Sequence, residues 1–124
     1  MTARPVEISP NHRLIRAYHQ SISEIRAQNV KHEGGLRHAF QVLLADSARL
    51  HDWTLVTEWT TSTPSGTIRL DGAVRDSNTI PRGYWEAKDT HDNLDREIEK
   101  KIRSRYPLDN TIFEDTQRAI LYLY

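Results

Sequence analysis

The chain has 124 residues, and its 17 lysines and arginines are balanced by 17 aspartates and glutamates. This length suits one domain with one modest core, and the balanced charge provides no global positive field that would attract nucleic acid. Cysteine is absent, which excludes disulfide scaffolds, thiolate zinc sites and a cysteine nucleophile. The six histidines form no HExxH or other closely spaced ligand pair.

The hydropathy of the chain indicates no membrane segment. No apolar run approaches the roughly 20 residues that span a bilayer, and the segment 1–13 lacks the apolar stretch of a secretory signal. We therefore expect a soluble, cytoplasmic protein without a membrane partner. The final run 117–124 is apolar and lacks a polar tail, so we expect a domain cut from a longer chain.

Apolar residues at helical spacing predict two helices in the first part of the chain. Ser9 and Pro10 provide a side-chain cap and a first-turn proline, so the first helix is predicted over about 10–31. Gly34 and Gly35 are predicted to break or sharply bend it, and a second helix follows to about residue 50. The apolar stripes of the two helices comprise Leu14, Tyr18, Ile22 and Ile25, and Leu36, Phe40, Leu43 and Leu44.

Three runs rich in β-branched and aromatic residues come next. They occupy 53–61, 67–75 and 83–89, and each is bounded by turn-forming residues. The separators 62–66 and 76–82 suit hairpin connections. We therefore predict an antiparallel meander of three strands.

A third helix is predicted over 93–106, with Asp92 as its cap and Pro107 ending it. The segments 111–115 and 117–124 then have strand character. The buried stripe of this helix is predicted to comprise Leu94, Ile98, Ile102 and Tyr106.

The alternation of side chains along strands suggests why acids interrupt two apolar runs. In the second predicted strand, Asp71 lies on one face, and in the third strand Glu86 and Lys88 share a face. An adjacent antiparallel pair can therefore bring these three side chains together. The opposite face would be anchored in the core by Leu70, Val74, Trp85 and Ala87.

Two carboxylates that converge on a sheet face form a hard oxygen site of the kind that binds Mg²⁺. Such a cation polarises a phosphoryl oxygen and lowers the pKa of a bound water, and a neighbouring lysine orients that water or offsets negative charge. The alternative is surface salt bridging, because an acid followed at a distance by ExK arises easily by chance. Asp76 and Asp89 lie at strand ends, where a turn or a cap explains them.

Asp71, followed after fourteen residues by Glu86-Ala87-Lys88, resembles the PD-(D/E)xK nuclease motif. The segment 83–115 further resembles the N-terminal, Mrr-like nuclease domain of type ISP single-chain restriction-modification enzymes. The resemblance implies an α/β (α+β) fold with a restriction-endonuclease-like core, a central mixed sheet of four to five strands flanked by helices. It also implies that residues 1–124 are one nuclease domain, excised from or N-terminal to a longer chain with helicase and DNA methyltransferase domains.

The same resemblance assigns expected roles to the motif residues. Asp71 and Glu86 would ligate Mg²⁺ together with the backbone carbonyl of Ala87, and Mn²⁺ is expected to substitute. Lys88 would be the catalytic lysine. Leu70 stands where the family motif has a proline, a position that varies widely.

Two further residues are candidates for the site. Glu33 is similar in its setting to an acid that the first helical region often adds to such sites, and the alternative is a helix-terminal charge. Gln117 resembles a glutamine that some RecB-like members carry after the core.

The third predicted helix carries basic residues at Arg96, Lys100 and Arg103, which are candidates for contacts with DNA phosphates. The alternative is a solvated helix face, because glutamates are interleaved with them. Glu97 is expected to pair with Lys101 on the same helix, a contact worth about 0.2–0.5 kcal/mol.

The expected function is a metal-dependent endonuclease that hydrolyses phosphodiester bonds of double-stranded DNA in a restriction-modification system. Cutting both strands requires two active sites or two visits, so a dimer on DNA is one expected arrangement. One alternative is a catalytically inactive, restriction-endonuclease-like module that binds DNA or another partner. A second alternative is a structural or regulatory protein whose strand acids are merely solvated.

Overall fold

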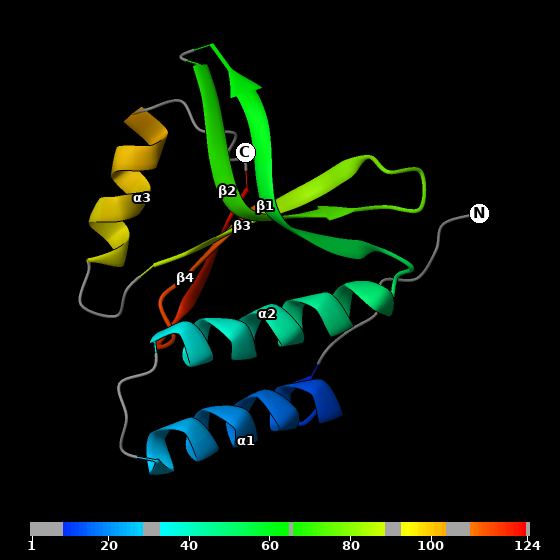
Figure 1. Ribbon diagram of the computed structural model, residues 1–124, viewed down its shortest axis with the longest axis vertical. Helices are drawn as coiled ribbons and strands as arrows, with labels where there is room; N and C mark the ends of the chain where they lie inside the picture. Colours follow the sequence, from blue (N-terminus) through cyan, green and yellow to red (C-terminus); the bar gives the residue numbers. More distant parts are fainter. Residues whose placement is uncertain (1–8, 29–32, 65, 89–92, 104–109, 124) are drawn as a thin grey trace. The chain divides into compact units, whose positions relative to one another are not determined.

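The computed structural model describes residues 9–28, 33–64, 66–88, 93–103 and 110–123. The chain forms two compact units, residues 1–53 and residues 54–124, and each is described by itself (Figure 1). None of the helices built by the described residues is long and apolar enough to cross a membrane.

The first unit contains the two predicted helices, α1 (Arg13–Ala27) and α2 (Glu33–Arg49). They pack through aromatic rings, since Tyr18 of α1 meets Phe40 of α2 edge to face with 6.1 Å between the ring centroids. Such a pair contributes about 0.5–1.5 kcal/mol beyond the area that it buries. The buried apolar side chains of these helices are Leu14, Ile22, Ala39, Phe40 and Ala48.

The predicted start of the first helix is wrong by three residues. The carbonyl of Ser9 accepts a hydrogen bond from the N–H of His12 at 2.9 Å, so this segment closes a turn. Helix α1 then begins at Arg13, and the Nδ1 atom of His12 accepts a hydrogen bond from the N–H of Leu14 at 3.2 Å. The histidine ring thus takes the capping role that the sequence suggested for Ser9.

Gly34 and Gly35 lie in the first turn of α2, whereas the sequence predicted that they break or sharply bend the first helix. A glycine weakens a helix most in its interior, and the first turn is where the backbone N–H groups lack intrahelical partners in any case. The helix therefore tolerates both glycines at its start.

The second unit is built around a five-stranded mixed sheet in the order β1-β2-β3-β4-β5. Its first three strands form the predicted antiparallel meander, β4 runs parallel to β3, and β5 runs antiparallel to β4. A parallel pair requires a crossover connection, and α3 lies in the chain between β3 and β4. The predicted mixed sheet of an α+β fold is confirmed. The elements are β1 (Thr54–Thr63), β2 (Gly66–Arg75), β3 (Pro81–Ala87), α3 (Leu94–Arg103), β4 (Thr111–Glu114) and β5 (Ala119–Tyr122).

Helix α3 packs on one face of this sheet. Leu94 and Ile98 form a buried cluster with Phe113 of β4, against which Ile120 and Tyr122 of β5 pack. Figure 1 shows α3 beside the strands. The face that carries Phe113 is therefore the face that α3 covers.

The start and the buried stripe of α3 differ in part from the prediction. Asn93 caps the helix, because its Oδ1 atom accepts a hydrogen bond from the N–H of Arg96 at 3.1 Å, while Asp92 lies outside the described residues. Ile102 is 40% exposed, so its predicted burial is wrong. At 3.6 residues per turn, two steps of four residues rotate Ile102 by roughly 80° away from Leu94. The predicted Tyr106 and Pro107 also lie outside the described residues.

Asp76 organises the turn between β2 and β3, as its position at a strand end indicated. Its Oδ1 atom accepts hydrogen bonds from the N–H groups of Asn78 and Ile80, at 2.9 and 3.0 Å, and its Oδ2 atom lies 2.8 Å from Nε of Arg82. The bond from Ile80, followed by the contacts with Arg82 and Asn78, lowers the pKa of Asp76. This acid is therefore structural. Asp89 lies outside the described residues.

Gly83 of β3 lies against the segment before β4. A Cβ atom at this position would stand 2.7 Å from the backbone carbonyl oxygen of Asn110, which is held by a hydrogen bond from the N–H of Tyr84 at 3.0 Å. We expect Gly83→Ala to lower the free energy of unfolding by about 1–3 kcal/mol, because the two backbones must separate. Urea unfolding measures this change. Thr67→Ala, at an exposed position of β2, serves as the control, and equal stability of the two variants would contradict the expectation.

Candidate active site

The candidate site lies where β2 and β3 separate. The pairing of β2 with β3 runs from Arg75↔Pro81 to Gly72↔Trp85. The pairing of β2 with β1 extends further, to Thr63↔Gly66. Beyond Trp85, β3 continues along β4, and the N–H of Lys88 donates to the carbonyl of Glu114 at 2.7 Å. The two strands therefore fork at the residues that follow Gly72↔Trp85 in the register, which are Asp71 and Glu86.

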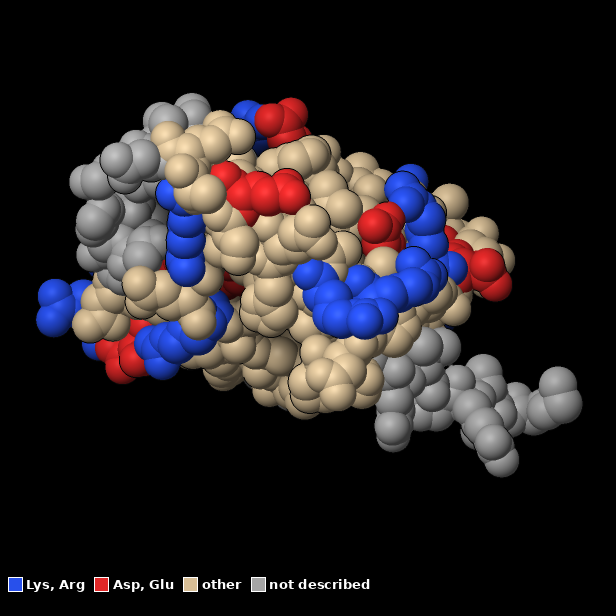
Figure 2. Space-filling model, turned by 90° about the horizontal axis from the view of Figure 1, so that it is seen from below, with Lys and Arg blue, Asp and Glu red and all other residues tan. Residues whose placement is uncertain are grey.

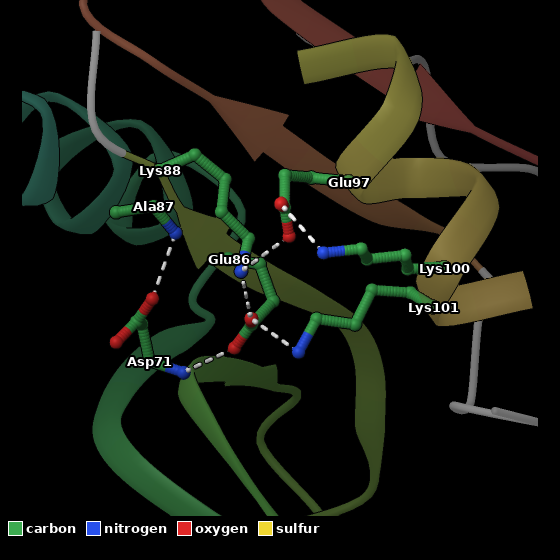
Figure 3. Close-up of polar contacts among 7 residues, drawn as sticks. All are labelled: Asp71, Glu86, Ala87, Lys88, Glu97, Lys100 and Lys101. Atoms are coloured by element: carbon green, nitrogen blue, oxygen red, sulfur yellow. Dashed lines mark hydrogen bonds and ion pairs between the residues drawn. The ribbon is translucent and has the colours of Figure 1, made fainter. Parts of the chain in front are cut away.

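Two carboxylates complete the hydrogen bonding at this fork. The Oε1 atom of Glu86 accepts a hydrogen bond from the N–H of Asp71 at 3.1 Å, and the Oδ2 atom of Asp71 accepts one from the N–H of Ala87 at 2.7 Å. Figure 3 shows this reciprocal arrangement. Each acid thus binds the backbone at or beside the other, which fixes both carboxylates in place.

Lysines surround the second oxygen of Glu86. The Nζ atoms of Lys88 and Lys101 each lie 3.7 Å from its Oε2 atom. Lys88 also lies 3.9 Å from Oε2 of Glu97, and Glu97 is 3.5 Å from Nζ of Lys100. Acids and lysines therefore alternate from the strand ends to α3 (Figure 3).

The environment of Glu86 opposes its ionisation. Glu86 is 5% exposed, and burial raises the pKa of its carboxyl above the ordinary value. The negative charge of Asp71 raises this pKa further, while Lys101, the N–H of Asp71 and Lys88 act in the opposite direction. A divalent cation at the two acids would offset the repulsion between them, so the donor set fits the Mg²⁺ that the motif implies.

The structure brings together Asp71, Glu86 and Lys88, as strand alternation predicted. The prediction that the opposite face is anchored in the core is also confirmed for three of the four residues. Leu70 and Trp85 are each 1% exposed and Ala87 is 7% exposed, whereas Val74 is half-buried. The ligand and catalytic roles of the acids and Lys88, and of the Ala87 carbonyl, stay predictions.

Contacts of the Glu33 and Gln117 side chains with the acids of the fork are not among those that the structure describes. Glu33 begins α2 in the first unit, and its side chain is not among those that the structure describes. Gln117 is exposed in the turn between β4 and β5, where its N–H donates to Oδ1 of Asp115 at 3.0 Å. Within the described ranges, no three side chains of histidine, cysteine, aspartate or glutamate are grouped to hold a metal ion. The roles of Glu33 and Gln117 stay predictions.

The basic residues predicted to meet DNA phosphates are accessible. Arg96, Lys100 and Arg103 are exposed on α3. Figure 2 shows that both basic and acidic side chains reach the surface. Such a mixed surface is in keeping with the balanced charge of the chain.

Glu97 and Lys101 are site residues that sequence reasoning missed, since they were assigned to a pair with each other on the helix surface. Lys101 lies seven positions after Leu94, so at 3.6 residues per turn the directions of the two side chains differ by only about 20°. Leu94 is buried against the sheet, and Lys101 must therefore point toward the sheet as well. This periodicity could be read from the sequence, but the sequence did not show that Glu86 is the acid that Lys101 meets.

With this geometry established, comparison with solved structures identifies a similar fold. A cryo-EM structure of a complex of DrdV with DNA matches with a TM-score of 0.82 and 41% sequence identity. The fold is restriction-endonuclease-like. The match covers 89% of this chain but 11% of that chain, so the chain spans about a ninth of the length of the protein that it resembles.

Neither a protein-family model nor a curated protein matches the chain. The sequence-based fold prediction is confirmed.

Proposed function

We propose that the chain is a Mg²⁺-dependent DNA endonuclease domain. The observation that carries the proposal is the reciprocal binding of Asp71 and Glu86 at the fork, with Lys88 beside them. A pair of acids buried or half-buried beside a lysine is a costly arrangement for a surface without chemistry, because burial opposes ionisation. The cost is explained if the acids hold a cation.

The residues of the chain would divide the work. Asp71, Glu86 and the carbonyl of Ala87 would hold Mg²⁺, and Mn²⁺ would substitute for it. When bound, the cation supplies polarisation of a phosphoryl oxygen and a lowered pKa for a bound water. Lys88, whose side chain is 17% exposed and lies at Oε2 of Glu86, would orient the attacking water and offset negative charge that develops on the phosphate.

The proposed substrate is double-stranded DNA, and the comparison supports DNA as a binding partner. The matched structure is a complex with DNA, and the match extends over 89% of this chain. Arg96, Lys100 and Arg103 would contact phosphates from the exposed side of α3. Because the match covers 11% of the other chain, a larger parent with helicase and methyltransferase domains in a restriction-modification system is part of the proposal.

Nicking of supercoiled plasmid tests the function. We expect conversion to open-circular DNA with Mg²⁺ or Mn²⁺ and none with EDTA. Equal conversion with EDTA would exclude the mechanism, because cleavage would then proceed without a divalent cation at the two acids.

A catalytically inactive, DNA-binding module is the second candidate. It is favoured by the fact that the matched structure shows a complex with DNA, since binding alone satisfies that observation. Calorimetric titration with Mn²⁺ separates the two candidates. The endonuclease requires a cation bound at Asp71 and Glu86, whereas DNA binding without cation binding would support the inactive module.

A further inference from the structure

Helix α3 contributes two charged side chains to the site. Glu97 and Lys101 are 24% and 18% exposed, whereas Lys100, between them in the sequence, is 64% exposed. A mostly buried lysine is unfavourable unless an acid lies close to it. The contact with Glu86 therefore stabilises the charge of Lys101 at this position.

The two lysines at Glu86 come from different parts of the chain. Lys88 follows β3 directly and lies between two acids, with Glu86 at 3.7 Å and Glu97 at 3.9 Å. Lys101 approaches the same Oε2 atom of Glu86 from α3, a separate element. The two lysines therefore reach the same oxygen of Glu86 from separate parts of the chain, the end of β3 and α3.

We propose that Lys101 offsets the charge of Glu86 in the metal-free protein and that a divalent cation at Asp71 and Glu86 competes with it. The inference rests on the proposed function, because it presupposes the cation site. Lys101 is then a positioning residue: it keeps the carboxylate of Glu86 oriented toward the fork before the cation arrives. Lys88 remains the lysine that acts on the substrate.

The competition has a measurable sign. A positive charge close to the two ligands repels a divalent cation, so its removal strengthens cation binding. For a partly solvated site, an effect of about tenfold on the dissociation constant is expected from Coulomb's law. The same removal leaves the buried carboxylate of Glu86 with one lysine fewer, so the metal-free protein becomes less stable. If Lys101 had a merely structural role, its removal would lower both the stability of the protein and its affinity for the cation.

The test is calorimetric titration of the metal-free chain with Mn²⁺, together with its thermal unfolding. Lys101→Gln, and Lys101→Met, which keeps the aliphatic stem, are expected to bind Mn²⁺ about tenfold more tightly than the wild type and to unfold at a lower temperature. Lys101→Arg keeps the charge and is expected to bind Mn²⁺ within about twofold of the wild type. Lys100→Gln is the matched control, because Lys100 is exposed and contacts Glu97 rather than the cation ligands.

The outcomes separate the inference from the proposed function. Suppose that the wild type binds Mn²⁺ and that neither Lys101→Gln nor Lys101→Met binds it more tightly. This result would overturn the role of Lys101 and leave the cation site standing. An equal gain in Lys100→Gln would also overturn it, because the effect would then come from net charge alone. No Mn²⁺ binding by any of the proteins would overturn the cation site and, with it, the inference.

Discussion

Asp71→Asn is expected to reduce Mg²⁺-dependent nicking of plasmid DNA by at least about 100-fold while the fold is retained. The asparagine Oδ1 atom can still accept the hydrogen bond that Asp71 receives from the N–H of Ala87 at 2.7 Å, so the fork keeps its backbone contacts. The cation site, however, loses one of its two negative charges. Transition-state stabilisation by a bound cation amounts to several kcal/mol, and each ~1.4 kcal/mol corresponds to a tenfold change in rate.

Initial rates of nicking measure this loss, and circular dichroism confirms the fold. Asp95→Asn is the matched control, because Asp95 is a 68% exposed acid of the same unit that pairs with Arg118 on the surface. Its rate should equal that of the wild type. Lys88→Ala should lose activity as Asp71→Asn does, and cleavage that survives in both variants would exclude the proposed mechanism.

Glu86→Gln is expected to abolish Mn²⁺ binding and, in the metal-free protein, to remove a destabilising effect of rising pH. Burial, and then the charge of Asp71, raises the folded-state pKa of Glu86 above its ordinary value of 4.5. Between 4.5 and the raised pKa, the native state therefore binds more protons than the unfolded state at this residue. Stability contributed by Glu86 is present below that window and is lost as the pH rises through the folded-state pKa.

Urea unfolding of the metal-free proteins over a series of pH values tests this sign. The free energy of unfolding of the wild type should fall relative to that of Glu86→Gln across the window, with a slope of at most about 1.4 kcal/mol per pH unit. Glu99→Gln, on the exposed side of α3, should follow the wild type. A difference between the wild type and Glu86→Gln that does not vary with pH would contradict the expectation.

Asp71 and Glu86 differ in how their surroundings affect their charge. Asp71 is half-buried and its carboxylate accepts a backbone hydrogen bond, whereas Glu86 is 5% exposed and its charge is opposed by its surroundings. The protein thus keeps a destabilising acid at the fork. Such a cost is typical of functional sites, where charge is arranged for chemistry and not for folding.

The sequence predicted the meander and the convergence of Asp71, Glu86 and Lys88 because both depend on local regularities. Side chains alternate with a period of two along a strand, so a correct strand pairing fixes which residues share a face. The hairpin that joins β2 to β3 is short, and its turn is closed by Asp76, which sets the pairing. No long-range information was required for this part of the site.

Helix ends were predicted less well, because several residues compete to cap them. Ser9 and Asp92 are good capping residues by type, yet His12 and Asn93 provide the observed hydrogen bonds. The difference between one capping residue and another is about 1 kcal/mol or less, which packing of the helix easily outweighs.

By itself, therefore, the sequence determined the order of the elements, the mixed α+β fold and the shared face of Asp71, Glu86 and Lys88. Only the tertiary structure decided that β2 and β3 fork at Asp71 and Glu86 and that Lys101 reaches Glu86. It also decided that the Glu86 carboxylate binds the N–H of Asp71 while the Asp71 carboxylate binds the N–H of Ala87. The physical reason is that alternation and helical periodicity give the direction of a side chain, while the partner it meets depends on how separate elements pack.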